Sequence, residues 1–588
     1  MCGETHCTGL RSERSDVLQG VVSSLLPVQP QGRGVGQHVW AHSVSRDLIN
    51  WNALEPAIYP SIPSDQYGCW SGSATLLADG TPAITYTGIS RPDVNYQVQN
   101  VAFPQKRLRP AAPRVGEVAE AEPDRHAGGR RHQRDAVPRP DHLADGHWRV
   151  LVSGRRRGPA VHAAMTGMWE CPDFFPVSGA GEEAGLDTSE RGEKYVLKNS
   201  LDLTRYDYYT VGRYNETTDR YIPDDPNGDR HRIRYDYGNF YASKTFYDPV
   251  KQRRILWGWA NESDTSIVDK AKGWAAIPRK IRLDPSGKQL LQWPIEEVEK
   301  LRGKPVTVDG KVVKPREHFE VTGLATAYQA DVEVSFEVSS LHKAEPFEPA
   351  YDNDAQKLCG VKGADVKGGV GPFGLWVLAS GDLQEKTAVF FRVFNSSRTD
   401  TASPRSSRSP HLYKPTFAGF VDTDISNGKI SLRSLIDRSV VESFGAGGKT
   451  CILSRVYPSL AIDKNAHLYV FNNGKADVKV SRLVAWEMKK PLMNGACGCP
   501  AGGDAGAKAR AAAALGQCRR LYFDAELAFT GAYDEINTPD YAAGKEIAAE
   551  AAALAHRCDD ALAEAGVTPS PLAQIGAVCT AITDLIVK

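Results

Sequence analysis

The sequence predicts a mainly β protein that ends in an all-α segment. Short apolar runs bounded by Gly, Pro and Asp recur from residue 38 onward, and Asp79-Gly80 separates two of them as a hairpin signal. Further along, apolar residues alternate with polar ones, as in a half-buried strand: Val332, Val334, Phe336 and Val338. After residue 504 the apolar period changes from 2 to 3.6. Short, evenly spaced strands are typical of a β-propeller or a β-sandwich.

The chain divides at changes in composition. A first β domain spans 38–300, and a second spans 305–490, where Asn473-Gly474 predicts a hairpin turn. Residues 492–504 are small and Gly-rich, which favours a flexible linker. Residues 505–588 carry two helical stripes, one around Cys518 and Phe529 and one around Leu554 and Cys558.

Two stretches break the strand pattern. Residues 1–37 show no clean alternation, and residues 105–146 are rich in Arg, Pro, Ala and Gly. Read alone, the second stretch is a disordered basic linker or, less favoured, a nucleic-acid tail. A linker of that length is unusual inside a compact domain. We expect both segments to be irregular.

Bulk composition excludes several classes of protein. The 588 residues include 71 basic and 71 acidic side chains, so net charge favours no nucleic-acid partner. No apolar run reaches the length of a membrane span. The 11 cysteines form no CxxC pair of metal-site spacing, and no cofactor motif is present. A soluble globular protein without a metal site or cofactor is expected.

One acid has an unusual setting: Glu170 lies between Trp169 and Cys171, followed by Pro172 and two aromatics. A lone Glu is most often a solvated surface residue. Here the apolar neighbours favour a partly desolvated carboxyl, which suits a general acid. Glycosidic chemistry also needs a second carboxylate facing it.

The stretch WECPDFFPV at 169–177 resembles the acid/base motif of glycoside hydrolase family 32, the plant acid invertases and fructan exohydrolases. Pro172 resembles the cell-wall type. Other stretches resemble the family in the same order, at 70–77, 200–215, 239–248, 257–265 and 437–461. The resemblance implies a five-bladed β-propeller over 38–300, incomplete here, and a β-sandwich over 305–490.

The resemblance also implies roles for individual residues. Glu170 corresponds to the acid/base, and Trp70 and Ser71 to sugar-contacting residues. Asp202 and Arg205 match a pair associated with glucose binding, hence with sucrose over fructan; the alternative is a surface ion pair. The implied activity is hydrolysis of sucrose or fructan with retention by a β-fructofuranosidase.

The family's nucleophilic Asp has no counterpart, since this sequence contains no Asn-Asp-Pro-Asn-Gly stretch. Its Arg-Asp-Pro motif is missing as well. Both can be recovered by reading possible codons one base forward, within 11–38 for the first and 132–143 for the second. We therefore expect frame errors or a damaged gene, and an impaired enzyme. The alternatives are an inert sugar-binding or regulatory protein and an enzyme inhibitor.

The helical tail resembles the pectin methylesterase and invertase inhibitors, without their N-terminal hairpin and first bundle helix. Cys518 and Cys558 match the disulfide of that family; two buried free thiols are the alternative. The partner this resemblance implies is a pectin methylesterase or an invertase. It leaves a partial helical bundle over 505–588.

Secretion is suggested by the family and by three glycosylation sequons, at Asn215, Asn261 and Asn395. No signal peptide is visible at the start of the sequence. The family implies an extracellular, cell-wall location.

Overall fold

The computed structural model describes most of the chain up to residue 492. Its described residues are 8–10, 22–28, 38–76, 82–92, 96–103, 169–179, 181–225, 233–262, 274–351, 354–395, 398–403, 416–422, 425, 427–492 and 557. Contacts divide the chain into two units, 1–494 and 495–588. The expectations for 105–146, for the linker 492–504 beyond its first residue, and for the helical tail with Cys518 and Cys558 lie outside the described residues.

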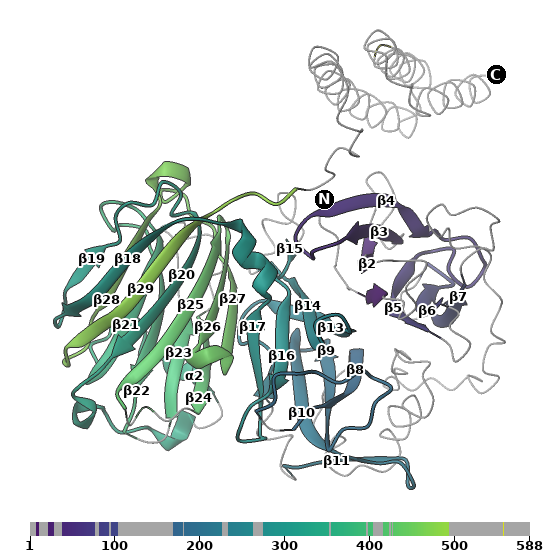
Figure 1. The fold of residues 1–588 in the computed structure, drawn as a ribbon, viewed down its shortest axis with the longest axis horizontal. Coiled ribbons are helices and arrows are strands. Elements are labelled where there is room, and N and C mark those ends of the chain that lie inside the picture. Colours follow the sequence, from purple (N-terminus) through teal and green to yellow (C-terminus); the bar gives the residue numbers. More distant parts are fainter. Residues whose placement is uncertain are drawn as a thin grey trace. The chain divides into compact units, whose positions relative to one another are not determined.

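Four antiparallel sheets occupy the described part of 8–294 (Figure 1). The first has the order β1-β2-β3-β4, with strands Thr8–Leu10, Val22–Val28, Val39–Ser45 and Trp51–Ile58. The second contains β5 (Cys69–Leu76), β6 (Pro82–Ile89) and β7 (Gln97–Ala102). Because Leu76 pairs with Pro82, the two strands flanking Asp79-Gly80 are antiparallel neighbours as predicted.

The expectation that residues 1–37 are irregular is wrong for part of that segment. Residues 22–28 form β2 and pair along their whole length with β3, from Val22 opposite Ser45 to Val28 opposite Val39. The sequence of this strand, VSSLLPV, has no strict alternation of apolar and polar residues. A strand can form through backbone hydrogen bonds even where apolar and polar side chains do not alternate. The missing alternation therefore did not exclude a strand.

The third and fourth sheets precede the sandwich. The third has the order β11-β10-β9-β8, with β12 pairing β10; its strands are Trp169–Val177 (β8), Lys194–Leu201 (β9), Tyr206–Asn215 (β10), Arg220–Pro223 (β11) and Ile233–Arg234 (β12). The fourth has the order β13-β14-β16-β17, with β15 pairing β14; its strands are Phe240–Asp248 (β13), Arg253–Ala260 (β14), Trp274–Ala275 (β15), Arg279–Leu283 (β16) and Leu290–Pro294 (β17). The 3-10 helix η2 (Glu296–Leu301) follows.

Two six-stranded sheets form the sandwich, with the orders β18-β29-β20-β25-β26-β27 and β19-β28-β21-β22-β23-β24. The first contains Arg302–Val313 (β18), Gln329–Glu337 (β20), Lys429–Asp437 (β25), Val440–Gly445 (β26), Thr450–Arg455 (β27) and Val478–Met488 (β29). The second contains His318–Glu320 (β19), Val370–Ala379 (β21), Thr387–Val393 (β22), Arg398–Ser403 (β23), Phe417–Asp422 (β24) and His467–Asn472 (β28). The connections carry α2 (Ala355–Val361), and the 3-10 helices Leu341–Lys343 (η3), Pro349–Tyr351 (η4), Ala446–Gly448 (η5) and Asp463–Asn465 (η6).

The core between these sheets confirms the predicted alternation. Val332, Val334, Phe336 and Val338 are all buried in one apolar cluster together with residues of the facing strand β21, including Phe373. Their polar neighbours Glu333 and Ser335 are only partly buried. Period-2 patterning therefore identified the strand and its buried face correctly.

The hairpin predicted at Asn473-Gly474 is wrong. The strands on either side, β28 and β29, belong to different sheets, so this turn carries the chain from one layer of the sandwich to the other. The side-chain amide of Asn472 donates through Nδ2 to Val313 O at 2.9 Å and to Ala476 O at 2.8 Å, which fixes the crossing. A Cβ on Gly474 would lie 2.6 Å from Gly371 N, so the turn requires glycine for close approach.

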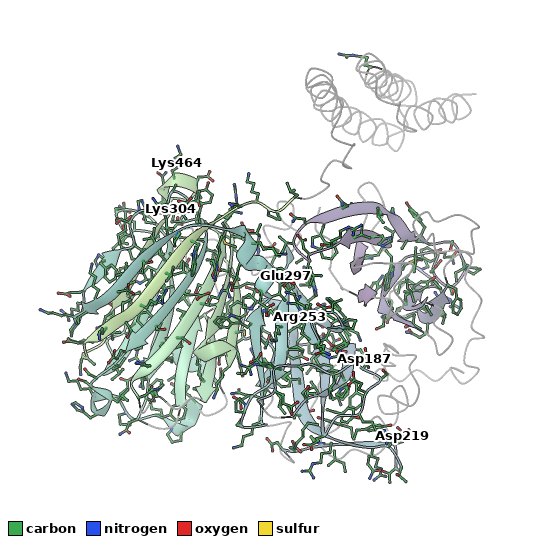
Figure 2. All side chains as sticks on the ribbon, viewed as in Figure 1. Asp187, Asp219, Arg253, Glu297, Lys304 and Lys464 are labelled. Atoms are coloured by element: carbon green, nitrogen blue, oxygen red, sulfur yellow. The ribbon has the colours of Figure 1, made fainter. Side chains whose placement is uncertain are left out.

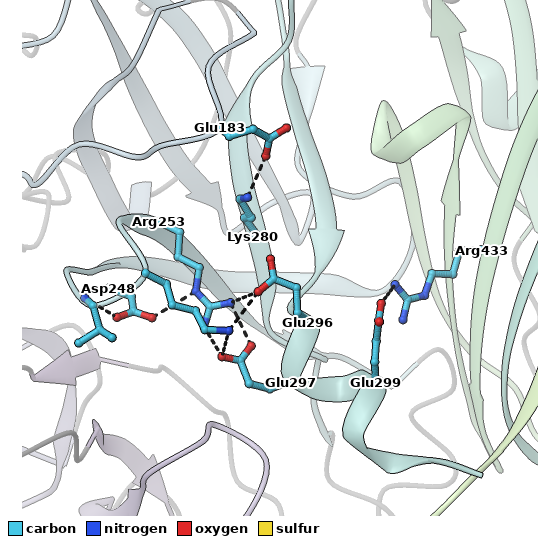
Figure 3. A network of polar contacts seen from close by, with 10 residues as sticks. Glu183, Asp248, Arg253, Lys280, Glu296, Glu297, Glu299 and Arg433 are labelled. Atoms are coloured by element: carbon cyan, nitrogen blue, oxygen red, sulfur yellow. Dashed lines mark hydrogen bonds and ion pairs between the residues drawn. The ribbon is translucent and has the colours of Figure 1, made fainter. Parts of the chain in front are cut away.

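A charged network joins the β13–β14 turn of the fourth sheet to η2 (Figure 3). Arg253 and Glu297, both labelled in Figure 2, form a bidentate pair with Nη2–Oε1 and Nη1–Oε2 distances of 2.6 and 3.0 Å. Lys251 Nζ lies 2.9 Å from Glu297 Oε1, and Asp248 Oδ2 lies 3.2 Å from Arg253 Nε. These contacts hold η2 against the β13–β14 turn, immediately before the sandwich begins.

Candidate active site

Glu170 lies directly before a β-bulge in β8. Glu170 pairs with Ser200 of β9 and Asp173 pairs with Lys198, so β8 has one residue more than its partner between these pairs. Cys171 adopts φ 44°, a left-handed conformation that is rare outside glycine. Bulges of this kind re-aim a neighbouring side chain.

A matching bulge interrupts β13. Tyr241 pairs with Trp259 and Lys244 pairs with Trp257, again with one extra residue on the bulged strand. Ala242 takes the left-handed conformation here, with φ 54°. Cys171, Tyr241, Ala242 and Trp259 form a small buried cluster, so the two bulges contact each other.

The two bulges bring Tyr241 to Glu170. The Tyr241 hydroxyl donates to Glu170 Oε2 at 2.6 Å, and the Glu170 side chain is only 15% exposed. Burial, followed by the charge of Glu170, raises the pKa of Tyr241 well above its ordinary value. The phenol therefore stays protonated and acts as a fixed donor to the carboxylate.

Arg205 also lies beside Glu170. It follows β9 in a tight turn, with its amide donating to Leu201 O at 2.9 Å and with φ 56°. Arg205 Nη1 lies 3.9 Å from Glu170 Oε2, and its guanidinium lies 5.4 Å from the centre of the Tyr241 ring. Because the Arg205 side chain is 53% exposed, it contacts both the carboxylate and solvent.

The other predicted site residues lie on different segments. Trp70 and Ser71 are on β5, also at a register shift, which falls between Cys69 and Gly72. Ser71 is buried, and Trp70 O accepts a 3.0 Å hydrogen bond from Trp40 Nε1. Asp202 is in the same turn as Arg205 and is partly exposed.

Sequence reasoning missed Tyr241 and the bulges. A signal was available in β8, since Pro172 within a strand marks an edge or a bulge. The bulge in β13 has no comparable signal, because alanine at position 242 does not favour a bulge.

The remaining calls concern sequons, metals and membranes. Asn215 and Asn395 are exposed, whereas Asn261 is partly buried. Within the part of the chain that the structure describes, no cluster of His, Cys, Asp or Glu could hold a metal ion. The helices found there are also too short or too polar to cross a membrane.

Comparison with known families decides the assignment. The model of the glycosyl hydrolases family 32 N-terminal domain matches residues 27–164 and 157–294, and the family 32 C-terminal model matches 297–487. The chain belongs to glycosyl hydrolase family 32. The first matched stretch contains the segment 105–146, which we expected to be aberrant through a frame error.

Two curated relatives from this family are similar over most of their length. β-Fructofuranosidase insoluble isoenzyme 1 of Oryza sativa subsp. indica is 67% identical over 503 residues, which cover 79% of this chain and 86% of that protein. The cell wall isozyme of Zea mays is 67% identical over 505 residues, covering 79% and 85%. By family and by these relatives, the chain is a β-fructofuranosidase, a glycosidase of the cell-wall, insoluble type.

Solved structures of the family share its fold. A variant of fructan 1-exohydrolase IIa from Cichorium intybus in complex with 1-kestose is 36% identical, with a TM-score of 0.71, and the match covers 83% of this chain and 96% of that one. An exo-inulinase from Aspergillus awamori, 18% identical with a TM-score of 0.58 over 83% and 96% of the two chains, shows the fold alone.

Proposed function

We propose that this β-fructofuranosidase acts on sucrose, or on a terminal fructosyl unit of a fructan, with retention, and that Glu170 is its acid/base. The observation that carries the proposal is the 2.6 Å hydrogen bond from Tyr241 to Glu170 Oε2, with Arg205 beside the same oxygen. In the first step the protonated Glu170 carboxyl gives its proton to the departing sugar oxygen. In the second step the same carboxylate takes a proton from water.

Arg205 and Asp202 are proposed to bind the glucose unit that leaves. The turn 201–205 places both residues beside β9, and Arg205 reaches Glu170. The exposed guanidinium is able to donate to sugar hydroxyls from the solvent side. Trp70 and Ser71 are proposed to contact the sugar from β5.

We also propose that turnover of this chain is low. A retaining mechanism needs a nucleophilic carboxylate about 5 Å from the acid/base. The stretch that carries the nucleophile in the family is missing from this sequence, and the match to the family model begins at residue 27. Removing one member of a catalytic unit typically removes most of its effect.

The test is hydrolysis of sucrose by the purified chain, read as release of fructose. We expect slow release that disappears in Glu170→Gln. Fructose release at the rate of an intact invertase would contradict the proposed impairment. Binding of sucrose in calorimetry without any release would favour an inert sugar-binding protein. Sequencing the transcript over 11–38 and 105–146 tests the proposed frame errors.

For residues 505–588 the proposal is a partial inhibitor-type helical domain with a Cys518–Cys558 disulfide. It rests on the sequence resemblance. Peptide mapping without reduction tests the bond, and inhibition of a pectin methylesterase or an invertase by the purified chain tests the role. Free thiols at both positions would contradict the disulfide.

A further inference from the structure

Lys198 and Asp207 form an ion pair with no solvent exposure directly behind the two bulges. Their Nζ–Oδ2 distance is 3.3 Å, and both side chains are 0% exposed. A buried ion pair is weak evidence for stability, because apolar residues of similar size often do as well. Its contacts with the backbone point to another role.

Each charge contacts the backbone that the bulges remove from strand pairing. Lys198 Nζ donates to Cys171 O at 3.0 Å in the β8 bulge and to Ser243 O at 2.6 Å in the β13 bulge. Asp207 accepts from the amides of Ala242 at 3.2 Å and Ser243 at 2.8 Å. Such backbone groups would otherwise be buried without partners, which is costly.

Ser200 links the two charges. Its hydroxyl donates to Asp207 Oδ1 at 2.6 Å and accepts from Lys198 Nζ at 2.8 Å. The ammonium group therefore has three hydrogen-bond acceptors for its three hydrogens. These hydrogen bonds tie the ammonium group of Lys198 to both bulges at the same time.

Glu170 and Tyr241 are each the residue immediately before one of these bulges. We propose that Lys198 and Asp207 are positioning residues for the acid/base: they hold the two bulges in register so that the Tyr241 hydroxyl meets Glu170 Oε2. This proposal rests on the proposed function of Glu170. Neither residue of the pair touches substrate in this account.

The test compares Lys198→Met with a matched control, Arg433→Met. Arg433 also forms a fully buried ion pair, with Asp331 at 2.8 Å, but within the sandwich strands β25 and β20. A crystal structure of Lys198→Met is expected to show the Tyr241–Glu170 distance lengthened beyond hydrogen-bond range. In Arg433→Met the distance should stay at 2.6 Å. An unchanged distance in Lys198→Met overturns the proposal.

Kinetics give a second readout, the ratio of the rates on sucrose and on an aryl β-fructofuranoside. A general loss of stability would leave this ratio unchanged. Sucrose has a poor leaving group that needs a proton, whereas an aryl β-fructofuranoside needs little protonation. A misplaced acid should lower kcat for sucrose by about 10²-fold, with a much smaller loss for the aryl substrate and little change in KM. Equal losses on both substrates, as expected for Arg433→Met, would contradict positioning.

Asp207 variants provide the conservative comparison, and they apply even if Lys198→Met does not fold. Asn keeps an oxygen that accepts from the Ser243 amide, so Asp207→Asn should retain most of the sucrose-to-aryl rate ratio and the short Tyr241–Glu170 contact. Asp207→Leu should lose both; retention of both in Asp207→Leu overturns the proposal. If the unchanged chain hydrolyses neither substrate, the proposed turnover fails, and the crystallographic distances alone decide the positioning role.

Discussion

Arg279 of β16 and Glu442 of β26 form an ion pair that joins the fourth sheet to the sandwich, with an Nη2–Oε2 distance of 2.9 Å. Neither side chain is more than 1% exposed. Asp236 lies 2.9 Å from the same guanidinium nitrogen, and Glu442 Oε1 accepts from the Ile277 amide at 2.6 Å. The interface is thus held by charges as well as by apolar packing.

Removing one partner of this pair should destabilise the chain strongly. Arg279→Met leaves Asp236 and Glu442 as uncompensated buried carboxylates, at a cost of about 3–5 kcal/mol in the free energy of unfolding. Urea unfolding measures it. The control is Lys280→Ala, whose partner Glu183 is 65% exposed and whose loss should cost under about 1 kcal/mol. Equal effects in the two variants would contradict the role assigned to Arg279.

Acid should weaken the η2 contact through Glu297. Burial alone would raise its pKa, but hydrogen bonds from Arg253 and Lys251 outweigh that effect and lower the pKa of Glu297 to about 2. A carboxyl with a lowered folded-state pKa stabilises the fold above its unfolded pKa, near 4.5, and loses that stabilisation as pH falls toward 2. The free energy of unfolding should therefore fall over this window. Glu297→Gln should be less stable at pH 7 and should show a flatter acid limb; a limb as steep as that of the unchanged chain would contradict the assignment.

Gly238 should tolerate no side chain. A Cβ at this position would lie 1.9 Å from Leu453 O, where the Asn239 amide donates to β27 at 2.7 Å across the boundary with the sandwich. We expect Gly238→Ala to cost roughly 1–3 kcal/mol through overpacking. Thermal unfolding measures the effect. Gly360 in α2 has open space around it, so Gly360→Ala is the control and should be neutral or slightly stabilising. A Gly238→Ala variant as stable as the unchanged chain would contradict the predicted clash with Leu453 O.

Glu170→Gln should lower the rate of fructose release from sucrose roughly 10²–10⁴-fold, since an amide cannot donate the required proton. Glu190→Gln is the control, because Glu190 is exposed and contacts the Asp187 amide away from Glu170. Tyr241→Phe should lower the rate less than Glu170→Gln, as it removes a fixed donor and leaves the acid. A Glu170→Gln variant as active as Glu190→Gln would assign the proton transfer to another residue.

Glycosylation should favour the exposed sequons. Asn215 and Asn395 are exposed, while Asn261 is partly buried and its backbone N–H donates to Asn239 O at 2.8 Å. Expression in a secretory plant system followed by peptide mass spectrometry should find glycans at Asn215 and Asn395 and low occupancy at Asn261. Full occupancy at Asn261 alone would contradict the role given to exposure.

Sequence reasoning was correct where a local pattern of apolar and polar residues determines which side chains are buried. Val332 and Phe336 reveal a buried face because alternation is local. The turn at Asn473-Gly474 could not be placed in the same way, since a hairpin and a crossing between sheets demand the same tight turn. The strand at 22–28 was missed because pairing with β3 depends on the partner's register. Tyr241 was missed because its contact with Glu170 arises from two bulges 71 residues apart.

The sheet order of the sandwich has a consequence for synthesis. β29 (Val478–Met488) lies between β18 and β20, so the last strand of the domain occupies a place between two strands near its beginning. On the ribosome, β18 and β20 are made roughly 150 residues before their shared neighbour, about ten to thirty seconds earlier at ordinary elongation rates. Over that interval their facing edges are open to other strands, including those of another nascent chain. Chaperone capture during translation should therefore be strongest between the emergence of β20 and that of β29.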